Sequence, residues 1–139
     1  MFHFYEQDIC DLDAMDRIFA EEKVEYVFHL AANSDIQASA NNPVIEYKNT
    51  YTTTFNLIEC MRRHNVKKLF FASTSAVYGE KMGTEVAETT TPLEPISYYG
   101  AAKLGSEALI SAYSYMNDLQ SVAVTAIVNI FSWQNILSF

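Results

Sequence analysis

Apolar residues recur along the chain in two patterns, one typical of helices and the other typical of buried strands. Apolar positions at helical spacing predict helices over residues 11–23, 43–64 and 97–118. Short, continuous β-prone runs predict strands over residues 2–6, 24–30, 68–72 and 121–128. Because strands and helices alternate, consecutive strands must run parallel and be joined by helical crossovers. The pattern therefore predicts an α/β fold with a parallel sheet.

The segments between these elements are expected to be loops. Residues 31–42 are small and polar, and residues 73–95 are rich in serine, threonine, glycine and proline. A connection as long as the second one is usually functional or disordered when it has no elements of its own. In an open α/β sheet, ligands bind beyond the carboxyl ends of the strands. The candidate site segments are therefore Asp8-Ile9, residues 31–35 and residues 73–79, and the helix from residue 97 borders the same crevice.

Composition and charge disfavour several classes of function. The chain has 139 residues, of which 50% are hydrophobic, and this is enough for one domain with a real core. It has 4 glycines, the first of them at Gly79, so the first half of the chain holds no glycine-rich phosphate loop. The net charge of −8 disfavours binding to nucleic acid or to an anionic membrane surface.

The two cysteines, Cys10 and Cys60, lack the spacing of metal ligands, so we expect no metal site. Reduced thiols are favoured for them, and a single disulfide is the alternative. No apolar run reaches the length of a membrane span. We therefore expect a cytoplasmic protein.

Tyr99 and Lys103 are the first candidates for chemistry, because a spacing of four residues places them on one face of the predicted helix. A cation beside a tyrosine favours the phenolate and lowers the pKa of the phenol. Such a tyrosine can accept and donate the proton of an alcohol. Thr74, at the end of the neighbouring strand, could hold the reacting oxygen. An exposed helix face that carries an aromatic residue and a lysine is the alternative, since chance alone gives roughly 0.4 such pairs in a chain of this composition.

Three strings occur in this order at the expected strand ends: HLAANSD (residues 29–35), STSAVYG (residues 73–79) and SYYGAAK (residues 97–103). Together they resemble the extended short-chain dehydrogenase/reductase superfamily, specifically its NAD-dependent nucleotide-sugar epimerases and dehydratases. The resemblance runs from Asp8 to about Asn129. It implies a Rossmann-like, doubly wound parallel sheet in three α/β/α layers, with NAD as the cofactor.

The resemblance also implies roles for individual residues. The residues implied to contact the cofactor are Asp8, Ile9, Ala31, Ala32, Asn49, Tyr99 and Lys103. The residues implied to carry the reaction are Thr74, Tyr99 and Lys103. The residues implied to contact the nucleotide sugar, a UDP-sugar above all, are Thr74, Tyr78 and Asn129.

Simpler roles remain open for several of these residues. Ala31 and Ala32 could serve tight packing, Tyr78 is expected to pack rather than bind, and Asn49 could be a surface amide. His29 lies inside a predicted buried strand and is expected to be a core residue rather than a ligand or base.

The residues after Thr74 discriminate between reactions. The related 4,6-dehydratases have an Asp-Glu pair there, because elimination of water needs its own acid and base. This chain has Ser75 and Ala76, which favours a 4-epimerase. Tyr99 would then take the proton of the sugar 4-hydroxyl while hydride passes to NAD, and the 4-keto sugar would rotate before hydride returns. A dehydratase, a reductase and a non-catalytic binding module are the alternatives.

The resemblance further predicts a fragment. We expect residues 1–130 to be the central part of an NAD(P)-binding Rossmann-like domain and residues 131–139 to be an atypical tail. The first, glycine-rich βα units and a C-terminal substrate domain would be absent. Residues 24–30 would then form an exposed apolar edge, and the isolated chain would bind NAD weakly or not at all and be inactive. The full-length protein is expected to be a homodimer through the helices of residues 43–64 and 97–118.

Overall fold

Three parallel strands form the sheet on which the candidate site is built. The computed structural model describes residues 1–81 and 86–124. The strands β1 (Tyr26–His29), β2 (Lys68–Ala72) and β3 (Gln120–Val124) lie in this order, and both neighbouring pairs are parallel. Three of the four predicted strands are thereby confirmed, and the predicted residues 125–128 of the last strand lie outside the described residues.

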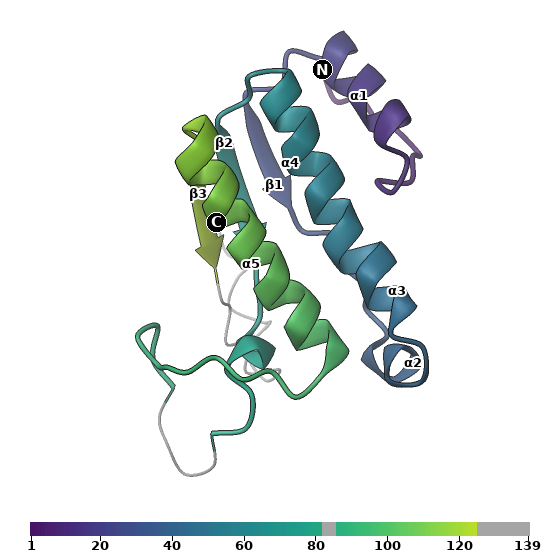
Figure 1. Cartoon of the computed structure of the whole chain (residues 1–139). Coiled ribbons are helices and arrows are strands. Elements are labelled where there is room, and N and C mark those ends of the chain that lie inside the picture. Colours follow the sequence, from purple (N-terminus) through teal and green to yellow (C-terminus); the bar gives the residue numbers. More distant parts are fainter. Residues whose placement is uncertain (82–85, 125–139) are drawn as a thin grey trace, which may run out of the picture.

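The three predicted helices are also confirmed. The first is α1 (Leu12–Glu21) and the last is α5 (Tyr98–Asn117). The middle one is a continuous helical rod composed of α3 (Val44–Glu46), the π-helical segment η1 (Tyr47–Thr52) and α4 (Thr53–Arg63). Figure 1 shows α4 and α5 running side by side along the sheet, with α1 packed against α4. Among the described helices, none is long and apolar enough to cross a membrane.

Two elements differ from the sequence-based expectation. The predicted strand over residues 2–6 is not a strand, and this segment lies outside the sheet, where His3 and Tyr5 hydrogen-bond to Glu22 at 2.5 and 2.6 Å. A β-prone segment becomes a strand only when a neighbouring strand pairs with it. The predicted loop over residues 31–42 contains a short helix, α2 (Ile36–Asn41). Asp35 starts this helix, because its carboxylate accepts the backbone N–H of Ala38.

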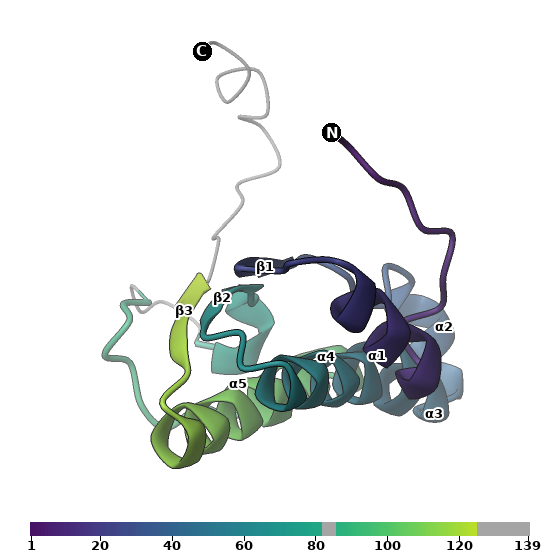
Figure 2. The same cartoon turned by 90° about the horizontal axis from the view of Figure 1, so that it is seen from above.

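The helices cover one face of the sheet and leave the other face open, as Figure 2 shows from above. Of the three layers that the resemblance implied, the described residues therefore form two. On the open face the register places Phe28 beside Phe70, and Phe70 beside Val122. Phe28 and Val122 are 68% and 59% exposed. Within the described residues β1 pairs only with β2, so the predicted apolar edge is present as well.

The core lies between the sheet and the helices. Its largest fully buried apolar side chains are Phe71 from β2 and Ile58 and Met61 from α4. His29 is buried in this region at the end of β1, 2% exposed, and its Nε2 lies 2.9 Å from the Thr54 hydroxyl. The prediction that His29 is a core residue is therefore confirmed. Burial, together with the positive charge of Lys103, lowers the pKa of His29 to about 4.

We expect Phe28→Lys to weaken self-association of the chain. A charge on the open face opposes the burial of that face against a second molecule, and association should weaken by about tenfold or more. Light scattering over a concentration series measures this effect. Ile96→Lys is the matched control, since Ile96 is 75% exposed but lies in the loop before α5. An equal effect of both variants would show that the open face is not the associating surface.

We expect the free energy of unfolding to fall as pH decreases from about 6.5 towards 4. In this window the unfolded chain binds a proton on His29, whose ordinary pKa is about 6.5, while the folded chain keeps the ring neutral. The loss approaches about 3 kcal/mol at pH 4. Urea unfolding at several pH values measures it, and His29→Gln is expected to remove this part of the slope. Parallel profiles for the two proteins would contradict the expectation.

Candidate active site

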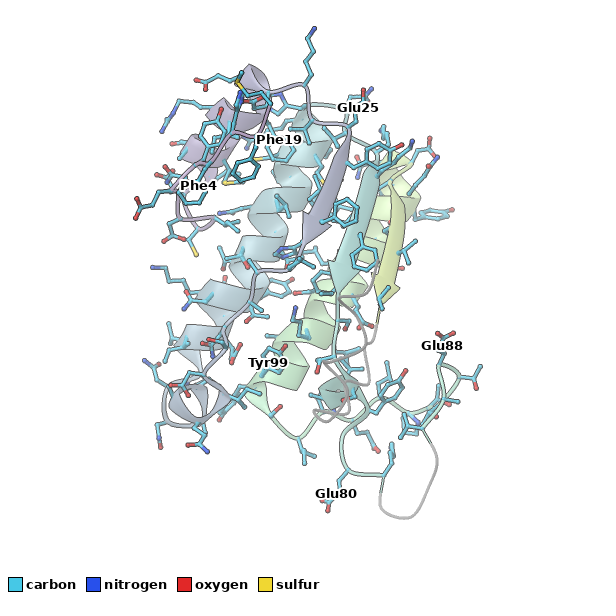
Figure 3. All side chains as sticks on the ribbon, turned by 180° about the vertical axis from the view of Figure 1, so that it is seen from behind. Phe4, Phe19, Glu25, Glu80, Glu88 and Tyr99 are labelled. Atoms are coloured by element: carbon cyan, nitrogen blue, oxygen red, sulfur yellow. The ribbon has the colours of Figure 1, made fainter. Side chains whose placement is uncertain are left out.

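The start of α5 places Tyr99 at the carboxyl end of the sheet. Ser97 begins the helix, because its hydroxyl accepts the backbone N–H of Gly100 at 3.0 Å. Gly100 then permits a close approach to the segment after β2: a Cβ at this position would lie 2.6 Å from the carbonyl oxygen of Ala76. Figure 3 shows Tyr99 in the first turns of α5, on the same end of the molecule as the helical segments that precede α4.

Thr74 lies opposite Tyr99 at the end of β2. It caps the short 3-10 helix η2 (Ser75–Tyr78), since its hydroxyl accepts the backbone N–H of Ala76 at 3.2 Å. The Thr74 hydroxyl is close enough to Tyr99 to lower the pKa of its phenol. The fold therefore brings together two of the three residues that the resemblance marked as catalytic.

Lys103, the third of these residues, is one helical turn further along α5 and is buried beneath it. Its side chain is 2% exposed, and its Nζ donates a hydrogen bond of 2.7 Å to the carbonyl oxygen of Ala72 at the end of β2. The same ammonium group lies 4.6 Å from the centre of the Phe71 ring. Burial lowers the pKa of Lys103 to about 8, and the nearby carboxylates of Glu107 and Glu46 act in the opposite direction.

The expected depression of the Tyr99 pKa is wrong for this structure. Burial and the negative charge of Glu46 raise the pKa of Tyr99, and only the Thr74 hydroxyl lowers it. The spacing placed Lys103 on the same helix face, but its ammonium is directed to Ala72 rather than to the phenol. The phenol of Tyr99 is therefore the favoured form.

Most of the residues expected to contact the cofactor meet in a hollow of about 370 Å³ beyond the carboxyl end of β1. Its lining includes all five that lie outside α5, namely Asp8, Ile9, Ala31, Ala32 and Asn49. The Asp8 carboxylate is exposed and accepts the backbone N–H of Cys10 at 2.9 Å, and this bond lowers the pKa of Asp8. Three segments that are separate in the sequence, residues 7–10, residues 31–34 and the part of the middle helix with Asn49 and Thr53, therefore form one concave surface that includes the exposed Asp8 carboxylate.

Two polar residues that the sequence reasoning missed, Asn56 and Thr50, hold this hollow in place. Asn56 of α4 donates to the carbonyl oxygens of Ile9 and Cys10, both at 2.9 Å. The Thr50 hydroxyl accepts a hydrogen bond of 3.2 Å from the backbone N–H of Asn33. The side-chain amide of Asn33 in turn donates a hydrogen bond of 2.7 Å to the Glu46 carboxylate. No spacing rule marks these residues, because each satisfies backbone from a different element.

The two remaining residues are placed differently. Tyr78 is 7% exposed within η2, as expected for a packing residue. Asn129 lies outside the described residues. Cys10 and Cys60 are both free thiols, so the disulfide alternative is not realised.

Comparison with known proteins decides the family. The family model for GDP-mannose 4,6 dehydratase matches residues 1–137, which is almost the whole chain. The chain belongs to this family. Its sequence is 35% identical over 128 residues to UDP-glucose 4-epimerase of Bacillus subtilis, covering 92% of this chain and 38% of that protein.

Solved structures agree with this assignment. The chain superposes on the UDP-Glc/GlcNAc 4-epimerase of Campylobacter jejuni with a TM-score of 0.83 at 37% identity, covering 88% of this chain and 37% of that one. It superposes equally well, at 35% identity, on Thermus thermophilus UDP-glucose 4-epimerase in complex with NAD, covering 88% of this chain and 40% of that one. The Rossmann-like fold class and the resemblance are thereby confirmed. The chain spans less than half the length of these relatives.

We expect the stabilising effect of Lys103→Met to be largest near neutral pH. Folding must bury a charged ammonium at pH 7, whereas at higher pH the folded chain releases the proton with a pKa of about 8 before the unfolded chain does. Between pH 7 and 9.5 the free energy of unfolding of the wild-type protein should therefore rise by about 2 kcal/mol relative to that of the variant. Urea unfolding of both proteins at these pH values measures the gain.

Lys67→Met is the matched control for this experiment. Lys67 is half-buried, and it also donates to a carbonyl oxygen, that of Asn117. Because it is less buried, its removal should change the pH dependence less. Equal pH dependence in both variants would show that burial of the Lys103 ammonium does not control stability.

Proposed function

We propose that this chain carries the catalytic segment of an NAD-dependent nucleotide-sugar 4-epimerase. The observation that carries the proposal is the convergence of Thr74, Tyr99 and Lys103 at the carboxyl ends of β2 and the start of α5. Convergence at this place is expected for a ligand site in an α/β sheet. Its relatives named as UDP-glucose 4-epimerases support the substrate class.

In the proposed reaction Tyr99 exchanges a proton with the 4-hydroxyl of the sugar. Thr74, whose hydroxyl acts on the Tyr99 phenol, would orient the same oxygen, and Lys103 would supply a buried positive charge beside it. When bound, NAD supplies the acceptor for the hydride that leaves C4 of the sugar. The transient 4-keto sugar would rotate in the site before hydride returns to its other face. Tyr99 must therefore be able to return the proton to the 4-oxygen in either orientation of the sugar.

The hollow beside β1 fits the adenine end of such a cofactor. Ala31 and Ala32 have small side chains where a ligand would approach the backbone, and the Asp8 carboxylate is exposed beside them. A carboxylate is suited to accept hydrogen bonds from an amino group or hydroxyl. We propose that Asp8, Ile9, Ala31, Ala32 and Asn49 hold this part of NAD. The Thermus thermophilus relative, whose structure contains NAD, supports this assignment.

A dehydratase of the same family is the second candidate, since the matching family model is named for GDP-mannose 4,6 dehydratase. The segment after Thr74 favours the epimerase. Ser75 and Ala76 form the first turn of η2 and present a hydroxyl and a methyl group. Neither group can act as the acid and base that elimination of water requires. A reductase and a non-catalytic binding module are further alternatives.

We further propose a homodimer of the complete protein and a cytoplasmic location. The adjacent helices α4 and α5 carry exposed apolar side chains, Phe55 on the first and Tyr115 and Met116 on the second. Exposed apolar residues on neighbouring helices are suited to a helix-mediated interface. The free thiols of Cys10 and Cys60 support a reducing compartment.

The test joins this segment to the remaining parts of Bacillus subtilis UDP-glucose 4-epimerase, so that the relative's full length is present. We expect interconversion of UDP-glucose and UDP-galactose. Tyr99→Phe should reduce kcat by about 10²–10⁴-fold, because the phenol that exchanges the proton is gone. Chromatography of the products separates a C4 epimer from the product of water elimination.

Tyr98→Phe is the matched control. Tyr98 is the neighbouring residue and is 52% exposed, so the loss of its hydroxyl should leave kcat within about twofold. Equal activity of the Tyr99→Phe variant and the parent would refute the catalytic assignment. A 4-keto-6-deoxy product would refute the epimerase and favour the dehydratase.

A further inference from the structure

The carboxylate of Glu107 reaches from α5 to the residue that precedes Thr74. Glu107 is half-buried and lies four residues after Lys103 and eight after Tyr99, so these three side chains share one face of α5. Its carboxylate accepts a hydrogen bond from the hydroxyl of Ser73. The proposed reaction uses the first two residues of this helix face and gives no role to the third.

The bond to Ser73 accounts for the position of this carboxylate. Among the ion pairs within residues 1–81 and 86–124, none includes Glu107. A hydroxyl that donates to a carboxylate forms a charge-assisted hydrogen bond, which is roughly twice as strong as one between neutral groups. The two residues are 34 positions apart in the sequence, so the bond joins α5 to the segment that follows β2.

Ser73 is held from two sides. Its side chain is bonded to α5, while its backbone N–H donates a hydrogen bond of 2.9 Å to the carbonyl oxygen of Val124, the last residue of β3. The residue before it, Ala72, accepts the hydrogen bond of 2.7 Å from Lys103. Two successive residues at the end of β2 are therefore tied to the same face of α5.

The position of Thr74 depends on this attachment. Successive Cα atoms are about 3.8 Å apart across a trans peptide, so Thr74 cannot move independently of Ser73. Thr74 has an extended backbone, and its hydroxyl accepts the backbone N–H of Ala76 at the start of η2. A displacement of about 1 Å at a reacting group can reduce a rate by about 10²-fold. Loss of the bond between Ser73 and α5 would permit such a displacement.

We propose that Glu107 is a positioning residue that, through its hydrogen bond to Ser73, holds Thr74 opposite Tyr99. This inference rests on the proposed function, because it gives Glu107 a task in the same reaction. Lys103 ties the last residue of β2 to α5 and Glu107 ties the next residue, so the helix that carries Tyr99 also sets the place of Thr74. Glu107 contacts neither sugar nor cofactor in this arrangement. Its removal should therefore lower kcat and leave KM nearly unchanged.

The first test measures kcat and KM of the enzyme in which this segment is joined to the remaining parts of Bacillus subtilis UDP-glucose 4-epimerase. Ser73→Ala and Glu107→Leu should each reduce kcat by about tenfold and leave KM within about twofold. The double variant should be no slower than either single variant, because all three lose the same bond. Glu107→Gln keeps a group that can bond to the Ser73 hydroxyl, so it should retain kcat within about threefold.

Ser114→Ala is the matched control. The hydroxyls of Ser114 and Ser121 are 2.8 Å apart and join α5 to the amino end of β3, so this variant also removes a side-chain bond between α5 and the sheet. It should leave kcat within about twofold, because this bond is away from the carboxyl ends of the strands. Unchanged kcat in Ser73→Ala and Glu107→Leu would overturn the proposal. So would additive losses in the double variant, a loss in Glu107→Gln equal to that in Glu107→Leu, or a loss in Ser114→Ala equal to that in Ser73→Ala.

Hydrogen exchange of the 139-residue chain tests the positioning without turnover. The backbone N–H of Ala76 donates to the Thr74 hydroxyl, so its exchange rate reports how firmly Thr74 is held. Glu107→Leu should raise this rate by about fivefold or more, and Ser73→Ala should do the same if the Leu variant does not fold. Glu107→Gln and Ser114→Ala should keep the wild-type rate.

The two measurements separate failure of the positioning from failure of the proposed function. An unchanged exchange rate of the Ala76 N–H in Glu107→Leu and Ser73→Ala would overturn the positioning role, even where the joined enzyme is an active epimerase. A raised rate in these variants together with an inactive parent enzyme would support the positioning role and count against the epimerase.

Discussion

The buried ammonium of Lys103 is the constraint on which the arrangement of the site depends. A charge that is removed from water must find a hydrogen-bond acceptor, and Lys103 finds it in the carbonyl oxygen of Ala72. This bond joins α5 to the last residue of β2. Tyr99 lies one helical turn before Lys103 on α5, and Thr74 lies two residues after Ala72. The positions of both residues are therefore tied to the bond that Lys103 makes. Burial of this ammonium lowers the free energy of unfolding, and it does so at the position where the proposed reaction needs a positive charge.

Close packing and backbone satisfaction complete the arrangement. Gly100 lets α5 approach Ala76 to a distance that no side chain would permit. Asn56 satisfies two carbonyl oxygens of the segment that carries Asp8 and Ile9. Buried polar side chains of this kind carry no chemistry of their own. They are needed because segments that end strands have backbone groups without partners in the sheet, and such groups are costly when buried.

Much of the fold was predictable because it depends on local patterns. The strand over residues 68–72 was predicted with the bounds that β2 has, and the ends of the helix over residues 97–118 differ from those of α5 by one residue. The failures have physical causes. Residues 2–6 are β-prone but have no pairing partner among the described strands. The helix α2 was missed because its residues are small and polar, although Asp35 provides an N-cap.

The sequence by itself determined the order of the elements, the strand ends where a ligand would bind, and the identity of Thr74, Tyr99 and Lys103 as candidates. It determined these because apolar periodicity and the spacing of motifs are properties of neighbouring residues. Only the tertiary structure decided how the candidates are charged. Tyr99 has its pKa raised rather than lowered, because the fold buries its ring and because the negative charge of Glu46, fifty-three residues earlier in the chain, acts on it. Charge interactions depend on distance and burial, and spacing along the sequence specifies neither.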